Sequence, residues 1–360
     1  MHGSGWHGYT AKRGGRAEIM PGKRKFDEQI AALEALREQP EDGQSHDGQN
    51  EDRLEKDRRA EPLRKALGGK NNFVAAKAAD LIREFRLTGL IPDLLAAFDR
   101  YFENAEKSDP QCWAKNAISH ALAAFEHQDA DVFLRGMRHI QMEPVWGGSS
   151  DTAGTLRATC ALALVQCRGV SEAELLKHLV DLLADSDKAV RAEVVRGIEQ
   201  VGSNAASLLL RVRATLGKDE PEVLGACYGG VLRIEGKPAI SWVSRFLKSH
   251  DDAAAEAALA IAGTRSLEGF EVLKDSLKEP LIDPWFRSVV LSAIALTRQP
   301  EASEFLLELV GNDSRDAEGA IEAVLRSAPS EEVVERLEKL VTGNARLARV
   351  FKANRNSSRS

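Results

Sequence analysis

The residue types in this 360-residue chain that could bind a metal are few and poorly spaced for the purpose. His139 and Glu143 are four residues apart, so on a helix they would share one face. Pro144 follows them directly, however, and disfavours a helix through this pair. A metal centre built from helices usually draws ligands from several of them. We therefore expect no metal and no cofactor.

A thiol nucleophile is the other reaction chemistry that the sequence allows. Cys160 and Cys167 are seven residues apart, so they lie on one face of an expected helix. A catalytic thiol needs a base, and His178 on the following helix is the nearest candidate in sequence. Cysteine is also among the residue types most often buried in cores. We take both cysteines as core residues and predict no catalytic residue.

Binding is better supported than catalysis, and the segment 103–157 is its best candidate. Trp146 lies in a break that contains proline and glycines, and Trp113 opens the helix before it. Long loops carried by a rigid scaffold often bind ligands, and Trp is a favoured interface residue. The alternative is that both Trp side chains pack beneath the loop. The residues that we predict to line a binding site are Trp113, Lys115, Asn116, Trp146, Asp151, Thr152 and Arg157.

The elements that must position these residues are helices that recur along the chain. Eight Ala-rich stretches have helical spacing of apolar residues, and each is followed by a break and a second apolar helix. Successive starts are 39, 43, 34, 34, 31, 31 and 31 residues apart. These stretches start at Val74, Trp113, Leu156, Val190, Leu224, Ala255, Phe286 and Ala317. Helix pairs at such a period indicate a repeat architecture.

The most regular stretch is Asp185–Gly202, DSDKAVRAEVVRGIEQVG. It resembles a HEAT repeat, in particular the short bacterial kind named after phycobilisome (PBS) lyase subunits. The resemblance covers roughly residues 71–343. It implies an all-α fold, an armadillo-like α-α superhelix (a HEAT-like α-solenoid) of about eight helix pairs. In HEAT proteins an Asp and an Arg form a ladder between adjacent repeats. The structural ladder residues that the resemblance implies here are Asp187, Arg191, Asp283 and Arg287.

The resemblance leaves two classes of function open. The first, which we prefer, is a non-enzymatic scaffold that binds a protein or peptide through its concave surface and the segment 103–157. The alternative is a HEAT-like-repeat enzyme or enzyme subunit, either bilin-lyase-like or a deoxyhypusine-hydroxylase-like oxidoreductase. Enzymes of the latter kind use His-Glu pairs in several repeats, and this chain contains no His-Glu dipeptide.

Charge is distributed unevenly along the chain. The formal net charge is −6, but residues 1–25 and 344–360 each carry +5, so the body between them carries −16. Such a body is poorly suited to a phosphate backbone, which is bound through Lys and Arg. We therefore expect no specific nucleic-acid binding and a preference for a basic protein or peptide partner.

The remaining expectations concern the ends of the chain and its location. We predict a disordered basic tail at 1–22, with Met20 as an alternative start to Met1. A helical cap at 23–70 follows, with a flexible linker at 41–52 and a helix that Pro62 divides. A second disordered basic tail is expected at 344–360. The absence of a signal peptide and of any long apolar run predicts a cytoplasmic protein without a membrane span.

Overall fold

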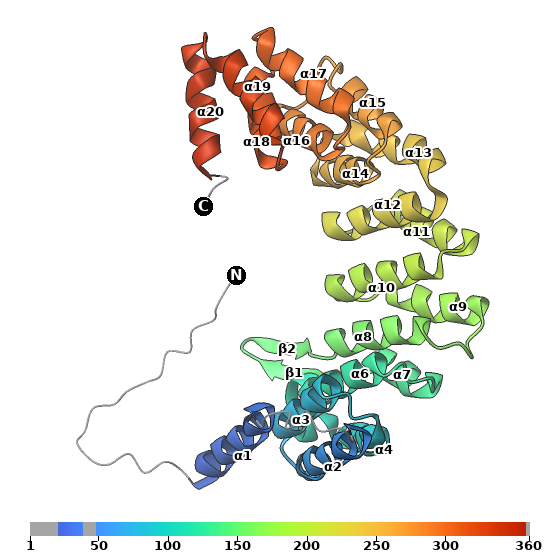
Figure 1. Ribbon diagram of the computed structural model, residues 1–360. Helices are drawn as coiled ribbons and strands as arrows, with labels where there is room; N and C mark the ends of the chain where they lie inside the picture. Colours follow the sequence, from blue (N-terminus) through green and yellow to red (C-terminus); the bar gives the residue numbers. More distant parts are fainter. Residues whose placement is uncertain (1–20, 39–47, 358–360) are drawn as a thin grey trace. The chain divides into compact units, whose positions relative to one another are not determined.

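The computed structural model describes residues 21–38 and 48–357, and these residues are almost entirely α-helical (Figure 1). Four short 3₁₀ helices, two short strands and the connecting loops make up the rest of these residues. The predicted all-α class is therefore confirmed. No helix in the described part of the chain has both the length and the apolar character needed to cross a membrane.

The chain forms two compact units, which are divided between Phe125 and Glu126. In the first unit, α3 packs against α2 and α6, and α4 also packs against α6. Short 3₁₀ helices at Thr88–Leu90 and Pro110–Cys112 precede α4 and α6. The α-helices of this unit are α1 (Pro21–Glu38), α2 (Gly48–Leu67), α3 (Asn72–Glu84), α4 (Ile91–Tyr101), α5 (Ala105–Ser108) and α6 (Trp113–Ala124).

The second unit contains the remaining helices and an antiparallel hairpin. Its first elements are α7 (Ala130–Met137), β1 (Met142–Val145), β2 (Gly148–Asp151), α8 (Gly154–Val165), α9 (Glu172–Leu182), α10 (Lys188–Val201), α11 (Asn204–Leu216), α12 (Pro221–Glu235) and α13 (Ile240–Ser244). The rest are α14 (Asp252–Gly263), α15 (Leu267–Ser276), α16 (Pro284–Leu296), α17 (Pro300–Gly311), α18 (Ala317–Arg326), α19 (Glu331–Val341) and α20 (Ala345–Ser357). Two 3₁₀ helices, Lys237–Ala239 and Arg245–Ser249, flank α13.

Helices in this unit pack in a regular order. Alternate helices form a series in which each member contacts the next; the series is α8, α10, α12, α14, α16, α18 and α20. Most members also contact the helix that follows them in sequence, as α10 contacts α11 and α16 contacts α17. Small residues permit this close packing; on α14, Ala254, Ala257, Ala258 and Ala262 are all buried. All eight stretches predicted from the sequence start within helices.

Side-chain caps define where many of these helices begin. Asp187 accepts a hydrogen bond from the backbone N–H of Ala189 (2.8 Å), and Asp283 accepts one from that of Trp285 (2.8 Å). Ser171, Ser203 and other Ser and Asp residues cap further helices in the same way. Each cap satisfies an N–H group that has no partner within its helix. The polar breaks of the sequence are therefore the starts of helices.

The structure differs from the sequence analysis near Pro62. The sequence analysis placed a division at this residue, but α2 continues through it to Leu67. A proline inside a helix removes one backbone hydrogen bond. Leu63 and Leu67, which follow Pro62 in the same helix, are buried. Burial of these leucines offsets the cost, so packing decides the conformation.

The C-terminal segment also differs from the prediction. We expected residues 344–360 to form a disordered basic tail, but Ala345–Ser357 form α20. Leu347 and Phe351 are four residues apart and buried, and α20 packs against α18 and α19. The prediction of a tail rested on net charge and did not take this apolar face into account. Residues 1–20 of the predicted N-terminal tail and 39–47 of the predicted linker region lie outside the described residues, whereas residues 48–52 belong to α2.

Candidate functional site

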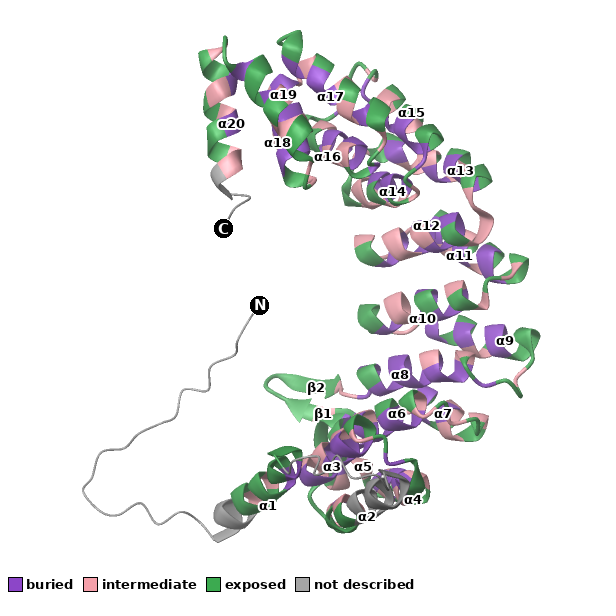
Figure 2. Ribbon diagram, in the orientation of Figure 1, coloured by how far each residue is buried: buried purple, intermediate pink, exposed green. Residues whose placement is uncertain are grey.

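A β-hairpin replaces the loop that the sequence predicted between the helices of the segment 103–157. Met142 pairs with Asp151 and Val145 with Gly148, which leaves Trp146 and Gly147 as a two-residue turn. Gly147 has φ +89°, a value that L-residues adopt rarely, so the turn depends on glycine. Figure 2 shows the hairpin exposed along nearly its whole length, and the Trp146 side chain at its tip is fully exposed.

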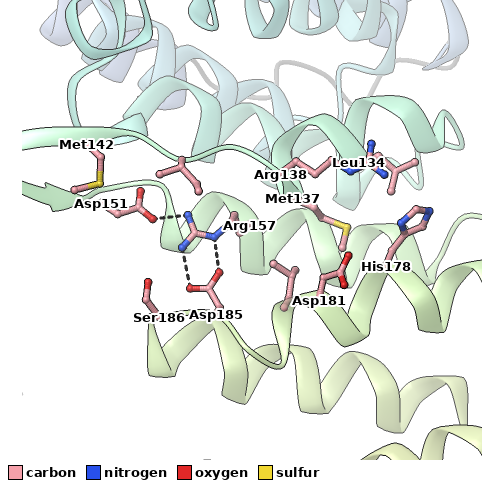
Figure 3. A pocket seen from close by; sticks show the side chains of 12 residues that line it. Leu134, Met137, Arg138, Met142, Asp151, Arg157, His178, Asp181, Asp185 and Ser186 are labelled. Carbon is pink, nitrogen blue, oxygen red and sulfur yellow. Dashed lines mark hydrogen bonds and ion pairs between the residues drawn. The ribbon is translucent and has the colours of Figure 1, made fainter.

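Arg157 of α8 holds the base of this hairpin in place. Its Nε and Nη2 donate to the two carboxylate oxygens of Asp185 (2.7 and 2.9 Å). Its Nη1 donates to Asp151 Oδ2 (2.6 Å) and to the backbone oxygen of His139 (3.0 Å). Arg157 is buried, so these bonds lie largely out of contact with water (Figure 3). The guanidinium thus joins α8, the hairpin and the loop before α10.

The charges in this cluster are mutually stabilised. Burial alone would raise the pKa of Asp151, but hydrogen bonds from the backbone N–H groups of Gln141 and Ala153 and from Arg157 bring this pKa below its usual value. Burial alone would lower the pKa of Arg157, but Asp185 and Asp151 raise it above its usual value. Asp151 and Arg157 are therefore charged at neutral pH.

A chain of polar side chains runs along the base of the hairpin. His139 Nε2 is 3.0 Å from Gln141 Oε1, and Gln141 Nε2 donates to Glu143 Oε1 (2.6 Å). Thr152 Oγ1 donates to the same carboxylate oxygen (2.9 Å). The sequence analysis placed His139 and Glu143 on one helical face, but α7 ends at Met137 and Glu143 lies on β1. Gln141 therefore lies between His139 and Glu143, the two side chains that would have had to bind the same metal.

A cavity of about 420 Å³ lies beside this cluster, between α7, the hairpin and α9. Its apolar lining includes Leu134, Met137, Ile140, Met142 and Leu182. Ile140 and Met142 are exposed at 66% and 45%, although both are large apolar side chains. Methionine side chains adapt easily to different ligand shapes. The cavity can thus accept an apolar group.

The polar lining gives this cavity a net negative character. It includes three aspartates and two arginines, together with His178 and Ser186. Asp151 and Asp185 share Arg157, whereas Asp181 forms no ion pair with any residue that the structure describes. Figure 3 shows Arg157 between Asp151 and Asp185, with Asp181 and His178 farther along the lining. The exposed carboxylate of Asp181 is therefore available to a cation.

Three of the predicted binding residues belong to the first unit, and one of them, Lys115, has a structural role there. Lys115 is completely buried, and its Nζ lies 3.0 Å from Asp109 and donates to the backbone oxygen of Tyr101 (3.1 Å). Trp113 is 43% exposed, with its ring 4.9 Å from that of Phe73. Lys115 thus stabilises the fold, and Trp113 remains partly accessible.

Asn116 is the third predicted binding residue of the first unit. It is half-buried, and its Oδ1 is enclosed without a hydrogen bond to any described residue. The four other predicted residues, Trp146, Asp151, Thr152 and Arg157, lie in the second unit, on the hairpin or just after it. Of these four, only Trp146 is fully exposed.

The implied Asp–Arg ladder has different partners from those expected. Arg191 donates to Asp219 and Arg287 to Asp316, which lie 28 and 29 residues later in the chain. The pair Arg157–Asp185 has the same separation of 28 residues. Asp187 and Asp283 instead cap their own helices, as described above. The arginines therefore link one helix pair to the loop before the next.

The cysteines have the environment of core residues. Cys112, Cys160, Cys167 and Cys227 are all buried free thiols. Burial, together with the Asp129 carboxylate, raises the pKa of Cys167, and its Sγ lies 3.7 Å from the backbone oxygen of His127. The reactive form of cysteine is the thiolate, which this environment disfavours. Across residues 21–38 and 48–357, no group of three or more His, Cys, Asp or Glu side chains is placed to hold a metal.

Sequence reasoning missed most of the residues that line the cavity. Ile140 and Met142 alternate with polar residues before Pro144, which is the period of a strand. This signal could have indicated the hairpin and its apolar side. His178 and Asp181 are three residues apart on α9, but nothing in sequence connects them with residue 142. A scan against protein-family models and a search of curated proteins each gave no match to this chain.

Proposed function

We propose that this protein is a HEAT-type helical-repeat scaffold, an α-solenoid, that binds a protein or peptide partner beside the β-hairpin. The observation that carries this proposal is the fully exposed Trp146 at the tip of a hairpin whose base, at Met142 and Asp151, lines the cavity between α7 and α9. A Trp in this position costs solubility without contributing to the core. Exposed aromatic side chains beside apolar cavities are typical anchors of interfaces.

The chemistry of the cavity defines the partner segment. Its apolar lining fits an aliphatic or aromatic side chain, and the carboxylate of Asp181 fits a neighbouring Lys or Arg. The negative body of the chain favours the same basic partner over longer distances. Arg157 does not contact the partner in this proposal; it keeps the hairpin and the cavity in position. A preformed site of this kind loses little conformational entropy on binding.

The regular packing of helices and the Arg–Asp pairs at intervals of 28 and 29 residues support membership of the HEAT type. The four buried free thiols fit a reducing compartment, and we therefore place the protein in the cytoplasm. We propose that the scaffold acts without catalysis; the described residues include no group of His, Cys, Asp or Glu placed to hold the metal that a hydroxylase-like alternative would need.

The experiment compares the full chain with three variants as bait in affinity capture from its native cell. Trp146→Ser and Asp181→Lys change exposed residues of the site, and Trp285→Ser is the matched control because Trp285 is also an exposed Trp (49%). We expect Trp146→Ser to weaken the affinity for the captured partner by at least about 30-fold, since interface anchors contribute about 2 kcal/mol or more. Trp285→Ser should bind as the wild type does.

Two results would contradict the proposal. One is equal recovery of every partner on Trp146→Ser and Asp181→Lys. The other is stoichiometric iron, zinc or a visible chromophore in the purified protein, which would favour the enzymatic class.

A further inference from the structure

A second surface of this protein is apolar where the corresponding surfaces are charged. On α11, Leu208, Val212 and Leu216 are 60%, 50% and 66% exposed. They are four residues apart, so they form one stripe along the helix. The stripe lies on the second helix of its pair, on a different element from the hairpin and its cavity.

The comparable helices of the second unit expose several acidic side chains and only single large apolar ones, such as Leu267 on α15 and Leu340 on α19. Examples of the acidic side chains are Glu268 and Glu271 on α15, Glu301 and Glu304 on α17, and Glu335 and Glu338 on α19. Charged side chains at these positions keep a surface helix in water. The face of α11 lacks this protection, which indicates that another molecule covers it.

The sequence around the stripe is also unusual in charge. Residues 203–218 and 236–249, which contain α11 and α13, hold six Lys and Arg and no Asp or Glu. The whole chain has 55 acidic residues against 49 basic ones, so these two segments without any acid differ in charge from the rest of the protein.

Side chains connect the two segments into one surface. The Arg211 guanidinium of α11 lies 4.4 Å from the ring centre of Trp242 on α13. Arg245 lies 4.9 Å from the same ring, and its Nη2 donates to Thr215 Oγ1 of α11 (2.9 Å). Lys248 is exposed on the same side of its short helix, three residues after Arg245.

The charges of this surface are only partly neutralised. Glu235 accepts hydrogen bonds from Arg211, and Asp219 accepts them from Arg213, so both arginines are already paired. Arg245 and Lys248 have no carboxylate partner among the residues that the structure describes. An apolar stripe therefore lies beside two cations that lack counter-charges.

We infer that the surface formed by Leu208, Val212, Leu216, Trp242, Arg245 and Lys248 is a docking site for an acidic amphipathic helix of a partner protein. Residues four apart on α11 rise by about 6 Å along the axis, which matches the apolar ridge of a second helix. Glutamates beside that ridge would pair with Arg245 and Lys248. A second copy fits less well, because it would present the same cations, Arg245 and Lys248, to this surface.

The test uses a fluorescein-labelled helical peptide with Leu at every fourth position and Glu at the flanking positions. Its binding to the full chain is followed by fluorescence anisotropy. We expect a Kd of about 10–100 μM. Leu216→Ser and Val212→Ser should each weaken binding about 10-fold, since burial of one such side chain contributes more than 1 kcal/mol. Arg245→Glu combined with Lys248→Glu should also weaken it and reduce its dependence on salt.

Controls separate this docking from general stickiness. Leu281→Ser removes another exposed leucine (92% exposed) and should leave the Kd unchanged. The substituted apolar side chains are half exposed or more, and Arg245 and Lys248 lie at the edge of the surface. The melting temperature of each variant should therefore stay close to that of the wild type.

Four outcomes would overturn the inference. The first is the absence of binding at about 1 mM peptide. The second is equal binding of a peptide in which Lys replaces Glu. The third is binding to phosphatidylserine-containing vesicles that Leu216→Ser abolishes, which would assign the surface to a membrane. The fourth is a dimer in sedimentation that Leu216→Ser dissociates, which would assign it to a second copy.

Discussion

The replacement of Arg157 by alanine tests whether this residue holds the hairpin and the cavity in place. Arg157 is 3% exposed and neutralises Asp185 and Asp151, whose side chains are 7% and 19% exposed. Removal of the guanidinium leaves both carboxylates in a poorly hydrated position without a counter-charge. Breaking a buried ion pair in this way costs about 3–5 kcal/mol. For a unit of this size, the melting temperature should fall by about 6–20 °C.

Arg346 provides a matched control for this prediction. It also pairs with two carboxylates, Asp313 and Glu318, but its side chain is 52% exposed. Exposed ion pairs contribute little to stability because water and salt screen them, so Arg346→Ala should melt within a few degrees of the wild type. Urea unfolding and calorimetry measure both variants. Equal stability losses in Arg157→Ala and Arg346→Ala would refute the reasoning, because burial would then not be the deciding factor.

Three further predictions concern other parts of the structure. Gly225→Ala should destabilise by about 1–3 kcal/mol in urea unfolding, since its methyl group would overlap the side chain of Glu256; Gly263→Ala, which meets open space, should not. Burial and the nearby Glu222 raise the pKa of Glu256, so its ionisation reduces folded-state stability as pH rises through that pKa. Glu256→Gln should therefore gain stability over the wild type at pH 7 and lose this advantage near pH 4. Phe351→Ala should cost about 3 kcal/mol if α20 is packed as the structure shows, whereas a disordered tail would show no loss.

The helices could be predicted from sequence because their signals are local. Apolar spacing and the polar breaks before Val190 and Phe286 mark helices whose caps the structure shows. Where the prediction failed, a longer-range effect was decisive. Pro62 stays in a helix because Leu63 and Leu67 are buried by neighbouring helices. The terminal helix forms because its apolar face packs against α18 and α19.

The candidate site could be predicted only in outline. The unusual spacing of the segment 103–157 indicated an irregular region, and Trp146 is its most exposed large side chain. The role of Arg157 depends on Asp185, which lies 28 residues away, and that of Lys115 depends on its complete burial. Neither distance nor burial can be read from residue types alone. Sequence patterns therefore indicated where the candidate site lies, and the fold determined which of its polar residues are exposed.

The central claim is that a partner binds beside the hairpin, with Trp146 as its anchor. The most direct measurement is calorimetric titration of the full chain with peptides selected against it from a random library. We predict that the selected peptides carry an apolar residue next to Lys or Arg. They should bind the wild type and Trp285→Ser equally, and Trp146→Ser at least about 30-fold more weakly. Peptides that bind Trp146→Ser and Asp181→Lys as tightly as the wild type would contradict the claim.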